Sequence, residues 1–376
     1  MTANPAAPSP AVSASVSASA GAELARERLW AAVRDADEYA AVRAAFDAVD
    51  AGLDTEALLL DVVAPLQARI GAEWAAARIT VAQEHAATAI QERVLAALAH
   101  RRAPRRPDAR APRVTVVCVD GEWHALPARL LAEVLRGRGW AVDYLGAHVP
   151  TPHLIAHLHR TGPGLVALSC SFAPHLPLAH AAVTACQAAG VPVITGGAAF
   201  GPDGRYARAF GADGWAAQAR QAAVVAQGVR RPDPLTLRET VDDLPHLADQ
   251  EYTLVAGTRQ QLVRDTLTQL ADLFPPVRAY TDRQRDRTAE DLAHVVDHLA
   301  TALYVDDADL FRGFLEWTAV VLTARGVPAR ALDPALDLLG RQLQDFPRAG
   351  RILRLGRETL GHVDEAPHEG GPGETV

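Results

Sequence analysis

Two short segments of the sequence hold polar residue types at spacings that suggest chemistry. The stretch WAAARITVAQEH carries Trp74, Glu84 and His85 inside an alanine-rich region whose pattern predicts largely buried helices. Burying a carboxylate and an imidazole costs free energy unless each has a partner. The stretch VDGEWHALPARL places Glu122 two residues before His124, directly after a predicted strand. Both segments raise the question of what their polar side chains face.

Length, composition and charge bound the class of protein. The chain has 376 residues, which predicts two or three domains. Apolar residues make up 49% and charged residues 22%, as in an ordinary globular protein. The net charge is -8 and every basic residue is arginine, without the basic stripe of a general nucleic-acid-binding protein. We expect no direct nucleic-acid partner.

Cysteine usage and the absence of targeting patterns indicate a cytoplasmic protein. Cys118, Cys170 and Cys186 lie far apart and form no CxxC pair, which is typical of buried thiols in a reducing compartment. Residues 1–21 are rich in Pro, Ala and Ser without a secretory pattern, and we expect them to be disordered. No run of about 18 apolar residues occurs, so no membrane span is expected.

Residues 22–102 predict a four-helix bundle. Asp54 fits a helix cap, a kink is expected at Pro65, and Thr80 and Gln83 have the spacing of a capping box. The Arg- and Pro-rich stretch that follows is typical of a linker.

Residues 112–228 alternate short apolar runs with helical stretches. The runs are VTVVCV, AVDYLG, LVALSCS and PVITGG, and their alternation with helices predicts a doubly wound parallel, Rossmann-like sheet. Ligands of such folds bind beyond the carboxyl ends of the strands, where loops enter the helices. Three loops should converge there, and they carry Glu122 with His124, Ser169 with Ser171, and Thr195 with Gly196 and Gly197.

After a linker at 229–246, residues 247–361 predict a third, all-α domain. Several stretches show helical periodicity, Asp307 fits a helix cap and Pro328 fits a helix start. We expect a globin-like or similar fold, followed by a disordered tail at 362–376. The chain as a whole is then an α plus α/β multidomain protein.

The three loops resemble those of the cobalamin-binding domain, in which a D-x-H-x-x-G loop, an S-x-L strand end and a G-G turn hold base-off B12. The resemblance implies that His124 is the lower ligand of cobalt and that Glu122 hydrogen-bonds its other ring nitrogen. It places Ser169, Gly196 and Gly197 in the slot for the nucleotide tail, where glycines let the backbone approach a ligand closely, with Ser171 and Thr195 beside them.

The chain departs from that pattern at three positions. Glu122 replaces the Asp, Pro127 replaces the Gly, and Ser171 replaces the Leu. A glutamate can still reach the imidazole, and proline is tolerated in the first turn of a helix. The departures therefore concern the geometry of the tail slot more than the cobalt ligand.

The bundle resembles the cap of the light-responsive, adenosylcobalamin-dependent bacterial regulators. Trp74, Glu84 and His85 match their W-x9-EH pattern, in which the Trp packs against the adenosyl group and the Glu and His surround its ribose. The resemblance implies a switch in which light breaks the cobalt–carbon bond and unpacks the cap. These regulators can have a cobalt-binding histidine directly after the Trp, and this chain has Ala75 there. The upper ligand after illumination is therefore open between water and a displaced His85.

The order of cap, B12 domain, linker and helical domain resembles the photocobilins, bacterial photoreceptors proposed to hold adenosylcobalamin and the linear tetrapyrrole biliverdin. The resemblance implies that residues 247–361 bind biliverdin, without a thioether link because they contain no cysteine. Arginines in a predicted loop would bind the propionates, and an alternative is haem bound through one of two histidines that share a helix face. The candidate contacts are Tyr280, Arg283, Arg285, Arg287, His294, His298, Tyr304 and Trp317.

We therefore expect a dual-chromophore photoreceptor that passes a light-driven change to a separate signalling partner and catalyses no reaction. A DNA-binding helix-turn-helix, which precedes the cap in known light regulators, is not expected here, because only the polar tail precedes the cap. A homo-oligomer is compatible with the sequence. Two other functions stay open: a corrinoid methyl-carrier of a methyltransferase, and a haem-binding globin-like sensor with a B12 domain.

Overall fold

The computed structural model describes residues 10–101, 110–230, 241, 243–273 and 278–365. The chain divides into two compact units. Unit 1 comprises the described parts of Met1–Trp74, Arg78–Ser171 and Leu178–Thr240, and unit 2 those of Ala75–Ala77, Phe172–Pro177 and Val241–Val376. No helix in these described ranges is long and apolar enough to cross a membrane. Most of the first predicted linker and the middle of the second lie outside the described residues.

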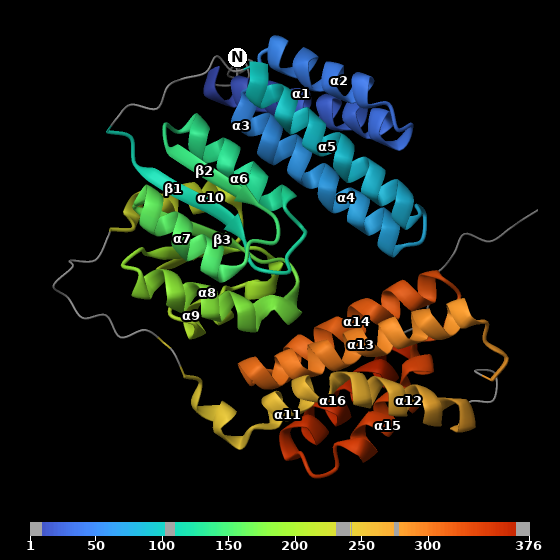
Figure 1. The fold of residues 1–376 in the computed structure, drawn as a ribbon. Coiled ribbons are helices and arrows are strands. Elements are labelled where there is room, and N and C mark those ends of the chain that lie inside the picture. Colours follow the sequence, from blue (N-terminus) through green and yellow to red (C-terminus); the bar gives the residue numbers. More distant parts are fainter. Residues whose placement is uncertain (1–9, 102–109, 231–240, 242, 274–277, 366–376) are drawn as a thin grey trace, which may run out of the picture. The chain divides into compact units, whose positions relative to one another are not determined.

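The first part of unit 1 is a helical bundle (Figure 1). Its elements are α1 (Pro10–Arg34), α2 (Glu38–Asp50), α3 (Thr55–Ala57), the π-helical η1 (Leu58–Val63), α4 (Ala64–Ala75) and α5 (Val81–Arg101). Because α3, η1 and α4 follow one another without a break, they form a single long helix. The irregularity expected at Pro65 is this π-helical stretch, which directly precedes α4.

Side-chain caps begin α2, α3 and α5. Asp37 caps α2 by accepting a hydrogen bond from the Ala40 N–H (2.8 Å). Asp54 accepts hydrogen bonds from the backbone N–H groups of Glu56 (2.9 Å) and Ala57 (3.2 Å). The predicted capping box is confirmed: the Thr80 N–H donates to the Gln83 side chain (2.8 Å), and the Gln83 N–H donates to the Thr80 hydroxyl (3.2 Å). These bonds satisfy N–H groups that the start of a helix leaves without an intrahelical partner.

Two predicted tails are partly helical. Helix α1 begins at Pro10, so the prediction that residues 1–21 are disordered is wrong from residue 10 onward. The segment PAVSASVSASAGAELARERL is rich in alanine, which has the strongest helix propensity of all residues. At the other end, α16 continues to Glu365, beyond the predicted start of the tail at 362. In both places helix propensity outweighs the low complexity of the sequence.

The second part of unit 1 is a five-stranded parallel sheet, which confirms the predicted doubly wound fold (Figure 1). Its strands are β1 (Arg113–Cys118), β2 (Ala141–Gly146), β3 (Leu165–Ser169), β4 (Val193–Gly196) and β5 (Gly214–Ala216), in the order β2-β1-β3-β4-β5. Its helices are α6 (Leu126–Gly137), α7 (Thr151–Thr161), α8 (Leu176–Ala188), α9 (Arg205–Ala209) and α10 (Ala219–Gly228), with a short 3-10 turn at η3 (Ala198–Phe200). The 3-10 turn η2 (Ala173–His175), which directly precedes α8 in the chain, is assigned to unit 2. Strand β5 was not predicted, because three residues are too short to show a strand pattern.

The bundle and the sheet share one apolar core. Val94 of α5 belongs to the same cluster of buried side chains as Val116 of β1. An ion pair adds to this contact, because Arg138, at the end of α6, donates to both carboxylate oxygens of Glu56 in α3 (2.7 and 3.0 Å). The Arg138 guanidinium lowers the pKa of the Glu56 carboxyl against the opposing effect of burial. The bundle therefore packs on the sheet as part of one folded unit.

Unit 2 is helical throughout its C-terminal described part (Figure 1). Its elements there are η4 (Pro245–Asp249), α11 (Glu251–Gly257), α12 (Arg259–Leu273), α13 (Asp282–Val305), α14 (Ala308–Ala324), η6 (Ala329–Leu332), α15 (Asp333–Gln342) and α16 (Pro347–Glu365). The Asp307 carboxylate caps α14 by accepting from the Asp309 N–H (2.9 Å), and Pro328 precedes η6, both as predicted. A globin-like fold for this unit stays a prediction.

The segment 282–287 is helical, which corrects the prediction of an arginine-bearing loop. Thr281 and Gln284 form a second capping box: the Gln284 N–H donates to the Thr281 hydroxyl (3.3 Å), and the Thr281 N–H donates to the Gln284 side chain (2.9 Å). The capping box starts α13 at this point, so the charged run continues as a solvated helix. Its exposed arginines are Arg283, Arg285 and Arg287.

Candidate functional site

The loop after β1 holds Glu122 and His124 together. One carboxylate oxygen of Glu122 accepts a hydrogen bond from the His124 N–H (2.8 Å) and lies 2.6 Å from the ring Nδ1 of the same residue. The other oxygen accepts from the backbone N–H of Ser171, in the loop after β3 (2.7 Å). The glutamate therefore reaches the imidazole and also ties two loops together. With Nδ1 engaged, Nε2 is the ring nitrogen that is left to bind a metal.

The two residues of this pair differ in exposure. The Glu122 side chain is fully buried at 0%, whereas 67% of the His124 side chain is exposed. The hydrogen bond from Glu122 raises the pKa of His124, and the charges of Glu122 and Glu84 add to the rise, while burial opposes it. Glu84 belongs to the bundle. The bundle therefore places a carboxylate within electrostatic reach of the His124 ring.

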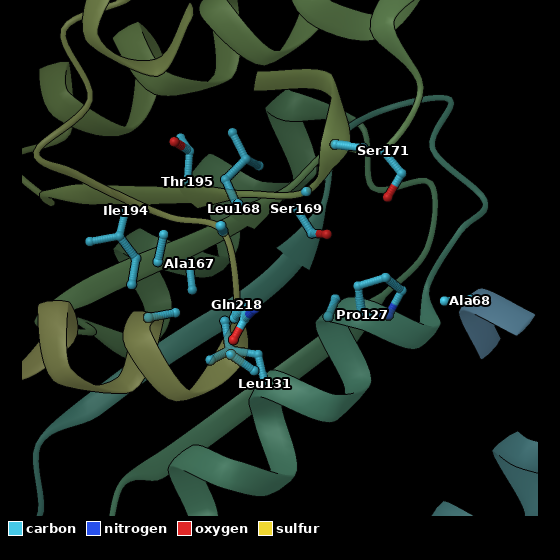
Figure 2. A pocket seen from close by; sticks show the side chains of 18 residues that line it. Ala68, Pro127, Leu131, Ala167, Leu168, Ser169, Ser171, Ile194, Thr195 and Gln218 are labelled. Carbon is cyan, nitrogen blue, oxygen red and sulfur yellow. The ribbon is translucent and has the colours of Figure 1, made fainter. Parts of the chain in front are cut away.

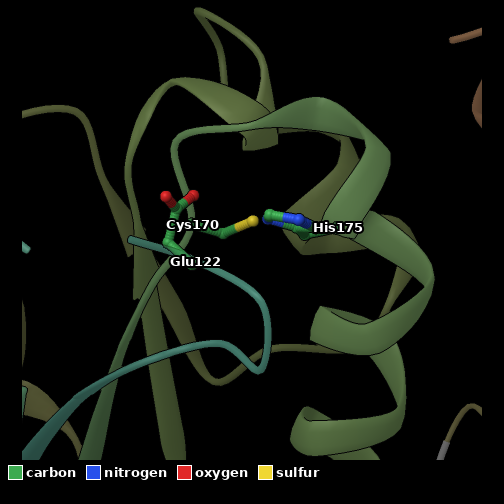
Figure 3. A group of neighbouring side chains, drawn as sticks. All are labelled: Glu122, Cys170 and His175. Atoms are coloured by element: carbon green, nitrogen blue, oxygen red, sulfur yellow. The ribbon is translucent and has the colours of Figure 1, made fainter. Parts of the chain in front are cut away.

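Cys170 and His175 lie beside Glu122 (Figure 3). One ligand-type atom from each of these three residues lies within 4.8 Å of the others. The Glu122 carboxylate already accepts the hydrogen bonds described above, and a buried thiol binds metals only after it loses its proton. We therefore interpret Cys170 and His175 as neighbours that help to hold the Glu122–His124 pair in place, and not as metal ligands. The Glu122 carboxylate is already bound to His124 and to the Ser171 N–H.

A cavity of about 480 Å³ lies at the carboxyl ends of β3, β4 and β5 (Figure 2). Its volume falls within the range of small-molecule pockets, roughly 300–1,000 Å³. The lining is mainly apolar, with Pro127 and Leu131 of α6 on one side and Ala68 of α4 reaching in from the bundle. Pro127 stands in the first turn of α6, as expected. An apolar cavity at this edge suits a flat aromatic group.

The residues predicted for the nucleotide slot line this cavity. In Figure 2, the Thr195 side chain points to the opposite side of β4 from its neighbour Ile194, as successive strand residues must. Its hydroxyl is buried and has no hydrogen-bond partner among the described residues. The contact of Thr195 with the cofactor stays a prediction. The predicted residues that line the cavity are Ser169, Ser171, Thr195, Gly196 and Gly197.

The packing of neighbouring loops requires a glycine at position 197 and leaves little room for a side chain at Gly196. Gly197 has a φ of +101°, and a Cβ at this position would lie 2.2 Å from the carbonyl oxygen of Cys170. A Cβ at Gly196 would lie 3.2 Å from the carbonyl oxygen of Ala216. A side chain at Gly197 would therefore push apart the loops after β3 and β4. From the sequence we expected these glycines to allow the close approach of a ligand. The structure shows that they stand where two loops approach each other closely.

The polar residues of the α4–α5 hairpin are more exposed than the sequence predicts. No residue from 74 to 85 is fully buried, because this stretch forms the end of α4, the turn and the start of α5. Glu84 and His85 form an ion pair with 2.7 Å between Oε2 and Nδ1, and their side chains are 26% and 74% exposed. Trp74 is half-buried in the last turn of α4. The structure thus joins Glu84 to His85 and leaves the imidazole accessible.

In unit 2, His298 of α13 is buried in surroundings that oppose a positive charge. The residue is 6% exposed, and its ring stacks on Phe314 with 3.7 Å between the ring centroids. Its Nδ1 lies 2.8 Å from the carbonyl oxygen of His294, to which it donates. Burial lowers the pKa of His298 to about 4. The ring is therefore neutral at pH 7, with Nε2 as an acceptor.

Apart from His294, whose ring packs with that of His298 against Phe172, the other predicted bilin contacts do not gather around His298. Arg283 stands near the start of α13, and at about 1.5 Å of rise per residue it lies roughly 22 Å along the helix from His298. Tyr280 packs instead against the buried pair Leu270 and Leu338. The remaining candidates are Arg287, His294 and Trp317, which are exposed, and Tyr304, which stacks edge-on against Tyr252. The structure does not assemble these residues into one site.

Some cavity and bundle residues have weak or no sequence signals. Ala68 is one of many alanines, and Gln218 follows β5, which is itself too short to predict. Gln91, in contrast, could have been identified from the sequence as a buried polar residue. It stands between Ile90 and Val94 on an apolar helix, and it is 0% exposed. A buried amide of this kind indicates a polar network inside the bundle.

Two segments of unit 1 match models of cobalamin-binding domains. Residues 112–224, which contain the sheet, match a B12 binding domain, and residues 25–99, which contain most of the bundle, match a second model that is also described as a B12 binding domain. The chain thus carries both parts of a B12-binding module. Cobalamin is therefore the cofactor that unit 1 binds.

Among characterised proteins, the chain is similar to the HTH-type transcriptional repressor CarA of Myxococcus xanthus. The two are 31% identical over 182 residues, which is 47% of this chain and 59% of the repressor. The chain therefore spans less than two thirds of the length of that relative.

The solved structures to which the chain shows similarity include a corrinoid protein and a cobalamin-binding protein. The monomethylamine corrinoid protein of Methanosarcina barkeri is 18% identical, with a TM-score of 0.47, over 53% of this chain and 95% of that chain. A cobalamin-binding protein from Desulfitobacterium hafniense DCB-2 is 20% identical, with a TM-score of 0.30, over 57% of this chain and 98% of that chain.

The described residues suit this cofactor. His124 offers a nitrogen donor for cobalt, and Glu122 fixes the orientation and protonation of its ring. The apolar cavity at the strand ends suits an aromatic nucleotide base. The residues predicted for these two tasks therefore lie in suitable places.

Proposed function

We propose that this protein is a light-sensing regulator that binds adenosylcobalamin in unit 1 and passes a conformational change to a separate signalling partner. The observation that carries the proposal is the placement of two histidine–carboxylate pairs. Glu122 holds His124 in the loop after β1, and Glu84 holds His85 in the bundle, with the charge of Glu84 felt at His124. The similarity to a transcriptional repressor over 47% of the chain supports a regulatory role.

Each pair has its own task in this proposal. His124 would hold cobalt through Nε2, and Glu122 would accept the hydrogen bond of the Nδ1–H, which fixes the tautomer that leaves Nε2 available to the metal. Glu84, His85 and Trp74 contact the adenosyl group from the bundle. When bound, adenosylcobalamin supplies a cobalt–carbon bond that visible light breaks. The polar hairpin of the bundle then loses the group that it contacts, and the bundle repacks.

The test is an absorption spectrum of the full chain loaded with adenosylcobalamin in the dark. Green light should change the spectrum, and hydrogen exchange in the α4–α5 hairpin should rise at the same time. The same protein loaded with hydroxocobalamin is the control, because it lacks the adenosyl group. A spectrum that stays constant under light while cobalamin is bound would rule out the proposal.

A corrinoid methyl-carrier is the competing function, and it makes a different prediction about the upper ligand. A methyl group needs only an apolar lid, whereas Glu84 and His85 are polar and partly accessible. Competition between adenosylcobalamin and methylcobalamin for the cofactor-free protein separates the two functions. Preference for the adenosyl form supports the regulator, and preference for the methyl form supports the carrier.

For unit 2 we propose a bound linear tetrapyrrole, biliverdin, beside His298. The supporting observation is a neutral, buried imidazole whose Nε2 can accept a hydrogen bond from a pyrrole N–H. Co-expression with a source of biliverdin should give a red-absorbing protein, and His298→Leu should shift or abolish that absorption. A colourless unit 2 would exclude the bilin, and a Soret band on addition of haem would replace it with the haem alternative.

A further inference from the structure

A chain of hydrogen bonds crosses the bundle from its core to Glu84. Gln91 of α5 is 0% exposed, and its Nε2 lies 2.5 Å from Oε1 of Gln67 in α4. The Nε2 of Gln67 lies 2.9 Å from the hydroxyl of Thr88. That hydroxyl lies 3.0 Å from Oε1 of Glu84. We call these four residues, Gln91, Gln67, Thr88 and Glu84, the Glu84 relay.

The direction of every bond in the Glu84 relay is fixed by its last member. An ionised carboxylate can only accept hydrogen bonds, so the Thr88 hydroxyl must donate its single proton to Glu84. The hydroxyl must then accept from an N–H of Gln67, which leaves the Gln67 carbonyl oxygen to accept from Gln91. All donors therefore point the same way. Such a chain polarises its members and strengthens the last bond, the one to the carboxylate.

The Glu84 relay leaves the carboxylate little freedom to turn. Thr88 holds Oε1, and the His85 ring holds Oε2 at 2.7 Å. Two helices supply these contacts, since Gln67 lies in α4 and the other members lie in α5. The carboxylate and the imidazole are thereby presented as a fixed pair at the exposed end of the hairpin.

The Glu84 relay takes the place of apolar packing between α4 and α5. Two amide side chains and a hydroxyl stand between α4 and α5, where larger apolar side chains would bury more surface. The Oε1 of Gln91 is buried and has no hydrogen-bond partner among the described residues. An unsatisfied buried carbonyl destabilises a fold. A network that costs stability and ends at a solvent-accessible pair indicates a role in binding.

We propose that Gln67, Thr88 and Gln91 are positioning residues that act through Glu84 and make the bundle select adenosylcobalamin over cobalamins with a small upper ligand. This inference rests on the proposed function of unit 1. An adenosyl group carries ribose hydroxyls that a fixed carboxylate–imidazole pair can recognise, whereas a methyl group offers no polar contact. The selectivity therefore depends on how rigidly the Glu84 relay holds its last member.

The experiment measures the affinities of the full chain for adenosylcobalamin and methylcobalamin by absorbance titration in the dark. Thr88→Val keeps the shape of the side chain but removes the hydroxyl. We expect it to lower the affinity for adenosylcobalamin about tenfold, or about 1.4 kcal/mol, because a hydrogen bond to a charged group is lost. The affinity for methylcobalamin should change less than about twofold. Thr88→Ser keeps the hydroxyl and should restore the selectivity.

Two further variants separate positioning from mere stability. In a Glu84→Ala background, Thr88→Val should have almost no further effect, since coupled residues are not additive. Thr55→Val, another threonine of the bundle, should leave the ratio of the two affinities unchanged. A thermal unfolding curve of every variant is measured to check that the chain is folded.

The outcomes distinguish this inference from the proposed function. A wild-type chain that does not prefer adenosylcobalamin overturns both. A wild-type preference that survives Thr88→Val overturns the Glu84 relay alone, and so does an equal loss of affinity for both cobalamins. An undiminished effect of Thr88→Val in the Glu84→Ala background also overturns it, because the hydroxyl would then act by another route.

Discussion

His124 in unit 1 and His298 in unit 2 are the same residue type in opposite environments. His124 is exposed, and a buried carboxylate bound to its Nδ1 raises its pKa. His298 is buried against Phe314, and its Nδ1 is bound to a neutral carbonyl, so burial lowers its pKa to about 4. Exposure and the charge of the Nδ1 partner decide the difference.

The contrast separates two ways of using an imidazole. At His124, the protonated ring is favoured, so a metal must compete with a proton for Nε2, and the glutamate offsets this by making Nε2 a stronger donor. At His298, the ring stays neutral across the physiological range and works as a fixed acceptor. A histidine beside a carboxylate is thus suited to bind a metal that can exchange. A histidine in an apolar core is suited to accept a hydrogen bond that does not change with pH.

The largest expected effect comes from removing the first of these rings. His124→Ala should lower the affinity of the full chain for hydroxocobalamin by more than about hundredfold, because even the loss of an outer partner of a metal ligand typically costs 10–100-fold. Absorbance titration measures the affinity, and the spectrum should lose the signature of histidine bound to cobalt. His153→Ala, an exposed histidine of α7, is the matched control. An unchanged spectrum would show that another residue binds the metal.

The second effect concerns the stability of unit 2 at low pH. The unfolded chain takes up a proton on His298 near pH 6.5, whereas the folded chain does so only near pH 4. Between these values the unfolded state binds more protons, so stability falls as the pH falls. The loss should reach roughly 2 to 3 kcal/mol, at about 1.4 kcal/mol per pKa unit.

Hydrogen exchange of α13 peptides between pH 7 and pH 4 measures this loss. In His298→Leu, the part of the pH dependence that comes from this ring should disappear. A slope that is identical in the variant and the wild type would mean that other groups cause it.

A third, smaller effect should make the two rings more alike. Glu122→Gln removes the negative charge beside His124, so the pKa of that ring should fall toward its ordinary value. Because the hydrogen bond to Nδ1 also weakens, the affinity for hydroxocobalamin should fall about tenfold. An NMR titration of the ring and an absorbance titration measure the two quantities. Glu122→Asp, which keeps the charge, should lose less. A pKa that stays raised in Glu122→Gln would contradict the assigned cause.

The smallest effect comes from opening the site of His298. Phe314→Ala removes the ring that stacks on the imidazole and lets water approach. The pKa of His298 should then rise by about half a unit to one unit, since the charged form is better solvated. NMR titration of the His298 ring checks this value. A pKa that does not move would show that the other neighbours of the ring, among them Phe172, exclude water from the imidazole without Phe314.

The sequence predicts features that depend on neighbours in the chain. The individual strands and helices, the capping box at Thr80 and the Glu122–His124 pair all involve residues a few positions apart, and the structure contains each of them. The same spacing occurs at Thr281 and Gln284, where the polar run was interpreted as a loop. The spacing of a capping box was therefore present there too, but the many charged residues of this run led to the prediction of a loop.

Features that depend on long-range packing could not be predicted in this way. The hydrogen bonds of the Glu84 relay join residues 21 and 24 positions apart, on two helices whose relative rotation the sequence does not give. The direction of the Thr195 side chain depends on the register of β4 in the sheet. The position of Gln218 at the cavity depends on β5, a strand too short to show a pattern.

The π-helical stretch Leu58–Val63 determines the direction in which each later side chain of the same helix points. A π turn takes in one residue more than an α turn, and each residue of an α-helix advances the side chain by about 100°. Deleting one residue from this stretch would rotate Gln67 away from Thr88 and Ala68 away from the cavity, while leaving the composition of the bundle almost unchanged. The number of residues in a single turn thus decides which side chains the bundle offers to a ligand.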